Sequence, residues 1–131
     1  MYAKGSLGLF LLIFAVSLFM PLATVSAETN SLTLYKTVFA PGEPIEGYFT
    51  ASSDFPASAW VGILPSDVPH GFEVTNDAND IAYQHLNNRT SGTLTFTAPA
   101  QPGAYDLRMN DTDDASQNGH EVASVSFTVS G

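Results

Sequence analysis

Apolar and polar residues alternate with a period of two along most of this chain. In segment 45–51, for example, Ile45 and Phe49 fall on one face while Glu46 and Thr50 fall on the other. This alternation is typical of β-strands that bury one face, and no stretch after residue 27 sustains a helical period. The pattern therefore predicts a protein built mainly of strands.

About seven strands are predicted, separated by clusters of Gly, Pro, Asn, Asp and Ser. Their ranges are 31–39, 45–51, 59–64, 81–86, 93–97, 104–109 and 121–129. Segment 59–64 (AWVGIL) is nearly all apolar, as expected for a central strand buried on both faces. Segments 65–80 and 110–119 are polar and irregular, which predicts two long loops.

Strand number and spacing predict an all-β fold, a single antiparallel immunoglobulin-like β-sandwich spanning residues 28–131. A small closed barrel is the alternative. Two aromatic residues are assigned structural roles. Trp60 begins the apolar central strand and is a candidate core anchor, whereas Tyr105 follows Pro102-Gly103, where sandwiches often place a tyrosine whose hydroxyl bonds to the backbone.

The first 27 residues have a different pattern. Lys4 is followed by an apolar run from Leu7 to Met20, then Pro21, and the small residues of Val25-Ser26-Ala27 complete the segment. The run is shorter than the roughly 20 residues that span a bilayer, so the order predicts a secretory signal peptide (1–27) and an exported mature protein without a membrane span. An uncleaved membrane anchor is the alternative.

Charge and composition exclude several functions. The chain has 13 acidic and 4 basic residues, a formal net charge of −9 and no cysteine. Without clustered Lys and Arg, binding to nucleic acid or to anionic lipid is not expected. Without cysteine there is no disulfide framework, thiolate metal site or catalytic thiol.

Several short motifs give the chain a family resemblance. The most specific are W-V-G-I (60–63) and P-G-A-Y-D-L-R-M (102–109), together with the P-G-E turn at 41–43. Over residues 31–129 the sequence resembles a bacterial extracellular immunoglobulin-like module, with a broader pattern shared by SKICH-type sandwiches. The resemblance implies a β-sandwich in a secreted or cell-surface setting, where such modules bind partners or act as spacers. It implies no catalytic residues.

The acidic residues are concentrated in sequence, because nine of the 13 lie in or beside the two long loops. Such crowding is unfavourable unless a cation offsets it, and Ca²⁺ accepts six to eight oxygen ligands. The candidate ligands for Ca²⁺ or another divalent metal are Asp77, Asp111, Asp113, Asp114 and Glu121. The EF-hand spacing is not met, and a solvated acidic surface is the alternative.

The remaining candidate residues are three histidines and one arginine. His70, His85 and His120 match no local metal motif, although His70 and His120 lie in the two acidic loops. Arg108 is expected to have a structural role, as the partner of Asp106 or of an acid on a neighbouring strand. The alternative for Arg108 is a ligand anchor, because a guanidinium binds carboxylates in a bidentate manner.

Enzymatic activity is not expected. Ser66, Asp67 and His70 lie too close together on one loop for triad geometry, and no nucleophile-elbow, zinc-protease or phosphate-loop motif is present. The sequence therefore predicts an exported, non-catalytic module that contacts a protein or surface ligand through loops 65–80 and 110–119. A divalent-metal-binding protein and a structural spacer remain as alternatives.

Overall fold

The computed structural model describes residues 29–116 and 118–131, which form eight strands and one short helix. The elements are β2 (Ser31–Leu34), β3 (Val38–Phe39), β4 (Pro44–Thr50), β5 (Trp60–Pro65), α1 (Glu73–Asp77), β6 (Ala82–His85), β7 (Ser91–Thr97), β8 (Gly103–Asn110) and β9 (Glu121–Val129). The predicted all-β class is confirmed. The predicted signal peptide (1–27) lies outside the described residues.

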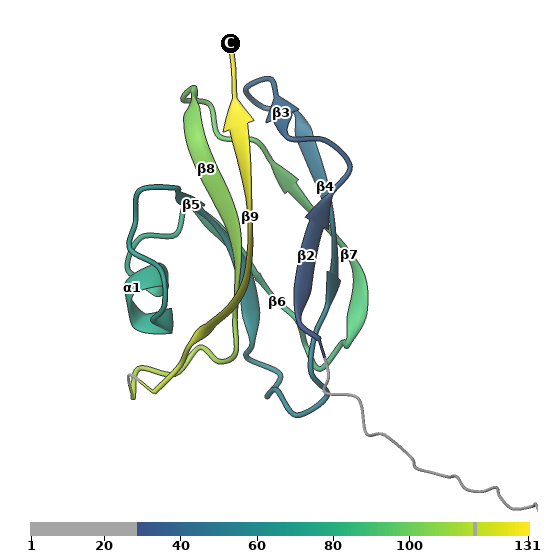
Figure 1. The fold of residues 1–131 in the computed structure, drawn as a ribbon, viewed down its shortest axis with the longest axis vertical. Coiled ribbons are helices and arrows are strands. Elements are labelled where there is room, and N and C mark those ends of the chain that lie inside the picture. Colours follow the sequence, from purple (N-terminus) through teal and green to yellow (C-terminus); the bar gives the residue numbers. More distant parts are fainter. Residues whose placement is uncertain (1–28, 117) are drawn as a thin grey trace, which may run out of the picture.

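The strands form two sheets that face each other, as Figure 1 shows. One sheet has the order β2-β4-β7 and the other has the order β3-β9-β8-β5-β6. Neighbouring strands within each sheet are mostly distant in sequence, so the chain crosses repeatedly between the layers. This is the arrangement of an immunoglobulin-like sandwich, and it places β5 and β8 in the centre of the larger sheet.

The first predicted strand, 31–39, is in fact two strands in different sheets. β2 pairs with β4, whereas β3 pairs with β9 after a break at Tyr35–Thr37. The β3–β9 pair is parallel, so the prediction of a purely antiparallel sandwich is wrong at this edge. The amide N–H of Thr128 donates to the carbonyl of Thr37 at 2.8 Å, which holds the crossing segment against β9.

The core lies between the two sheets and follows the predicted alternation. β4 alternates strictly between exposed and buried positions, with Ile45 and Phe49 buried. Leu94 and Phe96 from β7 and Leu107 from β8 join the same apolar cluster. Burial of this cluster supplies most of the driving force that holds the sheets together.

β5 is buried on both faces, as its continuous apolar sequence predicted. Val61 and Ile63 belong to the core between the sheets, whereas Trp60 is buried outside that core. Trp60 is fully buried, as its predicted structural role requires, but alternation along β5 directs its indole to the outer face of the larger sheet. There the ring lies over Gly62, where an added Cβ would come within 2.5 Å of it.

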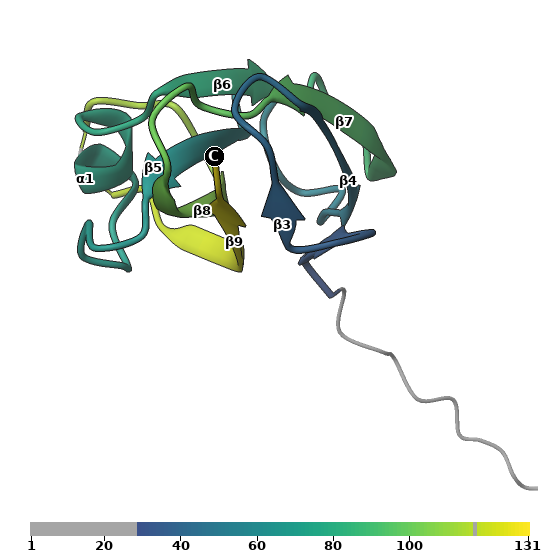
Figure 2. The same ribbon diagram turned by 90° about the horizontal axis from the view of Figure 1, so that it is seen from above.

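The outer face of the larger sheet is covered by segment 65–80, which includes the short helix α1 (Figure 2). The helix was not predicted. β5 and β8 are antiparallel, so loops 65–80 and 110–119 leave opposite ends of the sheet. Segment 65–80 nevertheless reaches the 110–119 loop by crossing this face.

Tyr105 forms the predicted corner at the start of β8. Its hydroxyl donates to the backbone carbonyl of Gln101 at 2.6 Å, and its ring stacks on Phe127 with centroids 5.8 Å apart. The prediction for Tyr105 is confirmed. The contact fixes the direction in which the chain enters β8 and therefore the position of the residues farther along this strand.

Candidate functional site

Segments 65–80 and 110–121 lie together and form one surface, which we call the acidic end. The amide N–H of Glu73 donates to the carbonyl of Gly119, and that of Glu121 donates to the carbonyl of Gly71, both at 3.1 Å. Phe72 and His120 form an isolated β-bridge between these two contacts. Backbone hydrogen bonds thus join two loops that are separated by 30 residues or more in sequence.

Close packing at Gly119 is part of this junction. A Cβ added at Gly119 would lie 2.6 Å from Cγ2 of Thr112 and 2.8 Å from Cβ of Glu73. Atoms at those distances overlap, so a residue without a side chain is required where the two segments meet. This glycine lets the backbone of the 110–119 loop approach the first turn of α1.

Arg108 anchors segment 65–80 to the outer face of the sheet. Its side chain is fully buried, and its Nε and one terminal nitrogen donate to Asp106 at 3.0 and 2.8 Å. Further donations reach the carbonyl of Val68 at 2.7 Å and the amide oxygen of Asn76 at 2.9 Å. The predicted ion pair between Arg108 and Asp106 is confirmed, and the same guanidinium also holds both the loop and α1.

Asn76 continues this buried network toward the 110–121 segment. Its side-chain nitrogen donates to Oδ1 of Asn110 at 2.8 Å and to Oε1 of Glu121 at 3.0 Å. The other oxygen of Glu121 lies 2.6 Å from Nδ1 of His70. Because each polar group has a partner, the network fixes α1 relative to β8 and β9.

A second polar cluster lies beside the first and consists of carboxylates. One oxygen from each of Glu73, Asp77 and Asp113 lies within 4.8 Å of the other two. Glu73 is 1% exposed and accepts a hydrogen bond from the indole N–H of Trp60 at 2.9 Å, whereas Asp77 and Asp113 are exposed. Oδ2 of Asp113 lies 2.9 Å from Nε2 of His85, within hydrogen-bonding distance.

The structure brings together only part of the predicted metal-ligand set. Asp77 and Asp113 converge, but the group that they form is completed by Glu73, which sequence reasoning did not select. Asp111 instead accepts the backbone N–H of His120, and Asp114 accepts that of Ser116, each at 2.9 Å. Glu121 belongs to the Arg108 network.

Nothing in the sequence distinguishes Glu73 from the other loop acids, because its burial depends on the unpredicted helix. Burial raises the pKa of Glu73, and the negative charges of Asp77, Asp113 and Asp111 raise it further, while the Trp60 hydrogen bond opposes the rise. Burial also raises the pKa of Asp80, with Asp77 as the largest charged contributor. The carboxylate cluster is therefore an environment that favours protons or other cations.

The three histidines do not converge. His70 lies against Glu121, His85 against Asp113, and His120 is 3.9 Å from Asp111. Among the described residues, the one group of possible metal ligands contains no histidine. A zinc- or copper-type site with several imidazole ligands therefore has no support in this arrangement.

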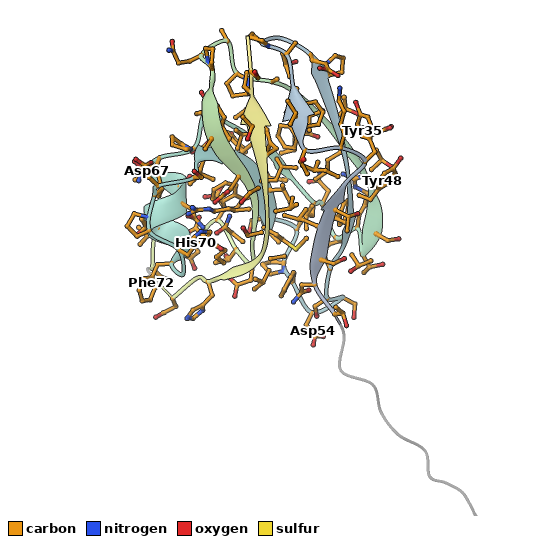
Figure 3. All side chains as sticks on the ribbon, turned by 45° about the horizontal axis from the view of Figure 1, so that its top comes forward. Tyr35, Tyr48, Asp54, Asp67, His70 and Phe72 are labelled. Atoms are coloured by element: carbon orange, nitrogen blue, oxygen red, sulfur yellow. The ribbon has the colours of Figure 1, made fainter. Side chains whose placement is uncertain are left out.

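The surface of the acidic end also carries an apolar residue, Phe72. Figure 3 labels its side chain together with that of His70. Phe72 is 58% exposed, and its ring lies 6.2 Å from that of His120. Val74, the second residue of α1, is exposed as well. A large aromatic side chain thus projects from a rigidly held, negatively charged surface.

Comparisons with known proteins found no match: no family model, no curated protein and no solved structure is significantly similar to the chain. The resemblance to SKICH-type modules therefore remains a prediction. None of the helices in the described residues is long and apolar enough to cross a membrane.

Proposed function

We propose that this protein is an exported, non-catalytic recognition module that binds a protein partner through the acidic end. The observation that carries this proposal is the exposed Phe72 ring, held by a β-bridge on a surface whose two segments are rich in acidic residues. Exposed aromatic residues on preorganised surfaces are frequent energetic centres of protein interfaces. The rigid network beneath Phe72 lowers the entropic cost of binding.

The charge of the acidic end specifies the kind of partner. Eight of the 13 acidic residues of the chain belong to segments 65–80 and 110–121. A basic surface on the partner complements this charge and accelerates association at low ionic strength. We therefore expect the affinity to fall as salt concentration rises.

Photocrosslinking tests this function. A photoreactive phenylalanine replaces Phe72 in cells that export the protein, and Tyr48, which is 46% exposed on the opposite sheet, is replaced as the matched control. We expect a discrete crosslinked partner from position 72 alone. With the purified partner, Phe72→Ala should weaken binding by about 2 kcal/mol or more, whereas Tyr48→Ala should not.

Two outcomes would contradict the proposal. Equal crosslinking from positions 72 and 48 would indicate unspecific contact, and the absence of any crosslink from either would favour a structural spacer. Export is tested separately by the mass of the protein recovered outside the cytoplasm. A mature N-terminus after Ala27 is expected from the signal-peptide pattern, and an intact Met1 would contradict it.

A further inference from the structure

The carboxylate cluster at Glu73, Asp77 and Asp113 has no Lys or Arg partner among the described residues. The three basic residues of the described chain are engaged elsewhere: Lys36 pairs with Glu43, Arg89 lies over the Phe49 ring, and Arg108 pairs with Asp106. The three carboxylate oxygens lie within 4.8 Å of one another and therefore repel one another. The imidazole of His85 contacts Asp113 alone among the three residues. Such an arrangement is unfavourable unless a cation joins it.

Glu73 supplies a second and independent observation. Its side chain is 1% exposed, and only one of its two oxygens accepts a hydrogen bond within the described part of the chain. Buried carboxylates normally satisfy both oxygens, and an unsatisfied buried oxygen requires an explanation. The carboxylate of this buried group lies at the cluster, with one oxygen within 4.8 Å of an oxygen of Asp77 and of Asp113, so a cation bound among the three would contact it.

Residues outside the cluster orient two of its three carboxylates. The indole N–H of Trp60 holds Glu73, and the imidazole of His85 holds Asp113, each at 2.9 Å. Each contact involves one oxygen of the carboxylate and leaves the second oxygen for another partner. Carboxylates that ligate metal ions are usually positioned by such hydrogen bonds.

We propose that Glu73, Asp77 and Asp113 bind one divalent cation, with calcium preferred, and that this ion ties α1 to the 110–119 segment. The ligands are all oxygens, which favours a hard cation over zinc or copper. Asp77 and Asp113 are exposed, so water molecules can complete the six to eight ligands that calcium takes. This site is independent of the proposed protein recognition, because no partner contributes to it.

Calcium binding to the chelator-treated, full mature protein tests the proposal. Trp60 is the single tryptophan of the chain and contacts Glu73 directly, so its fluorescence reports on the site without any activity assay. Titration with CaCl₂, followed by fluorescence and by calorimetry, should give saturable binding of one ion. The expected dissociation constant is about 10⁻⁴ to 10⁻³ M, typical of extracellular modules.

Matched variants locate the ion. Glu73→Gln and Asp113→Asn should each weaken calcium binding by about tenfold or more. Asp67→Asn and Asp114→Asn remove the same charge from acids outside the cluster and should change binding little. Asp113 is exposed, so its substitution keeps the test valid even if Glu73→Gln were to impair folding.

Three results would overturn the proposal. The first is no saturable change in heat or fluorescence up to about 10 mM calcium, beyond the range of known extracellular sites. The second is equal weakening by Asp67→Asn and Asp113→Asn, which would indicate unspecific attraction to the net charge. The third is tighter binding of Zn²⁺ that His85→Gln abolishes, because the ion would then use the imidazole.

Discussion

The indole N–H of Trp60 donates a 2.9 Å hydrogen bond to the carboxylate of Glu73, across the interface between β5 and α1. Both side chains are about 1% exposed. The bond satisfies the only polar atom of the tryptophan and one oxygen of the glutamate. The bond therefore connects the outer face of the larger sheet to the acidic end. It also places a carboxylate where burial disfavours the charged form.

Replacement of Glu73 by glutamine should stabilise the metal-free protein at neutral pH. Glutamine keeps an oxygen that can accept the Trp60 hydrogen bond, but it removes a buried negative charge close to Asp77 and Asp113. In buffer with chelator at pH 7, we expect a higher melting temperature for Glu73→Gln than for the wild type. Thermal unfolding followed by near-ultraviolet circular dichroism measures it, and Asp67→Asn serves as the control.

The same substitution should change how stability depends on pH. The pKa of Glu73 is raised in the folded state above its ordinary value of 4.5, mainly by burial, so the folded protein holds this proton to a higher pH than the unfolded chain does. The stability that Glu73 contributes should therefore be lost as pH rises from 4.5 through the folded pKa. Asp80, whose pKa is also raised, contributes in the same direction.

Urea denaturation at several pH values, in the presence of chelator, measures this dependence. We expect the loss of stability with rising pH to be smaller in Glu73→Gln than in the wild type, because the variant has no titrating group at position 73. Parallel curves for the two proteins would contradict the assignment of the raised pKa to Glu73.

Loss of Arg108 should be strongly destabilising. Its guanidinium is the charge partner of the buried Asp106 and the donor to Val68 and Asn76. Arg108→Met fills much of the same volume but leaves Asp106 as an uncompensated buried charge, which typically costs about 3 to 5 kcal/mol. Urea denaturation measures the loss, and Arg89→Met, at an exposed arginine that has no carboxylate partner among the described residues, is the control.

A double substitution separates the charge from the packing. If the cost of Arg108→Met comes from the orphaned carboxylate, adding Asp106→Asn should recover part of it, since the asparagine is neutral. A double variant that is as unstable as the sum of the two single variants would instead show that the two residues act independently.

Alternating patterns were enough to predict most of the strands and the core between the sheets, although they did not show that segment 31–39 divides into β2 and β3. Ile45, Phe49, Leu94 and Phe96 lie where a period of two places them, because local geometry assigns each side chain to one face of a sheet. Arg108 and Asp106 could be paired for the same reason, since they share the outer face of β8. These features depend only on neighbours within a strand or on adjacent strands.

The acidic end depends on tertiary contacts that leave no local pattern. Segment 65–80 shows no helical period, and α1 has only five residues, held by Arg108, Asn76 and the Gly119 junction more than by helix propensity. The burial of Glu73 follows from that helix. The members of the carboxylate cluster could thus be predicted only in part, as Asp77 and Asp113.

Gly62→Ala should destabilise the sheet beneath α1. An added methyl at position 62 would lie 2.5 Å from the Trp60 ring and 2.9 Å from the carbonyl of Ala82, so β5, β6 or the indole must shift. Overpacking of this kind typically costs about 1 to 3 kcal/mol. Gly131→Ala, where the nearest atom is 3.5 Å away, is the matched control.

Denaturation curves and Trp60 fluorescence together test this steric account. We expect Gly62→Ala to lower stability and to shift the emission of the displaced indole, while Gly131→Ala leaves both unchanged. A fully stable Gly62→Ala variant with unaltered emission would show that the indole does not lie over this glycine.

Tyr105→Phe should remove the hydrogen bond that fixes the corner before β8 and leave the ring stacked on Phe127. A neutral hydrogen bond of this kind contributes about 0.5 to 1.5 kcal/mol, and we expect a loss of that size in urea denaturation. Tyr83→Phe is the control, because the Tyr83 ring is 55% exposed and its hydroxyl has no hydrogen-bond partner in the described chain. Equal losses in the two variants would show that the corner contact adds nothing beyond the removal of a hydroxyl, whereas a loss confined to Tyr105→Phe would identify the bond to Gln101 as its source.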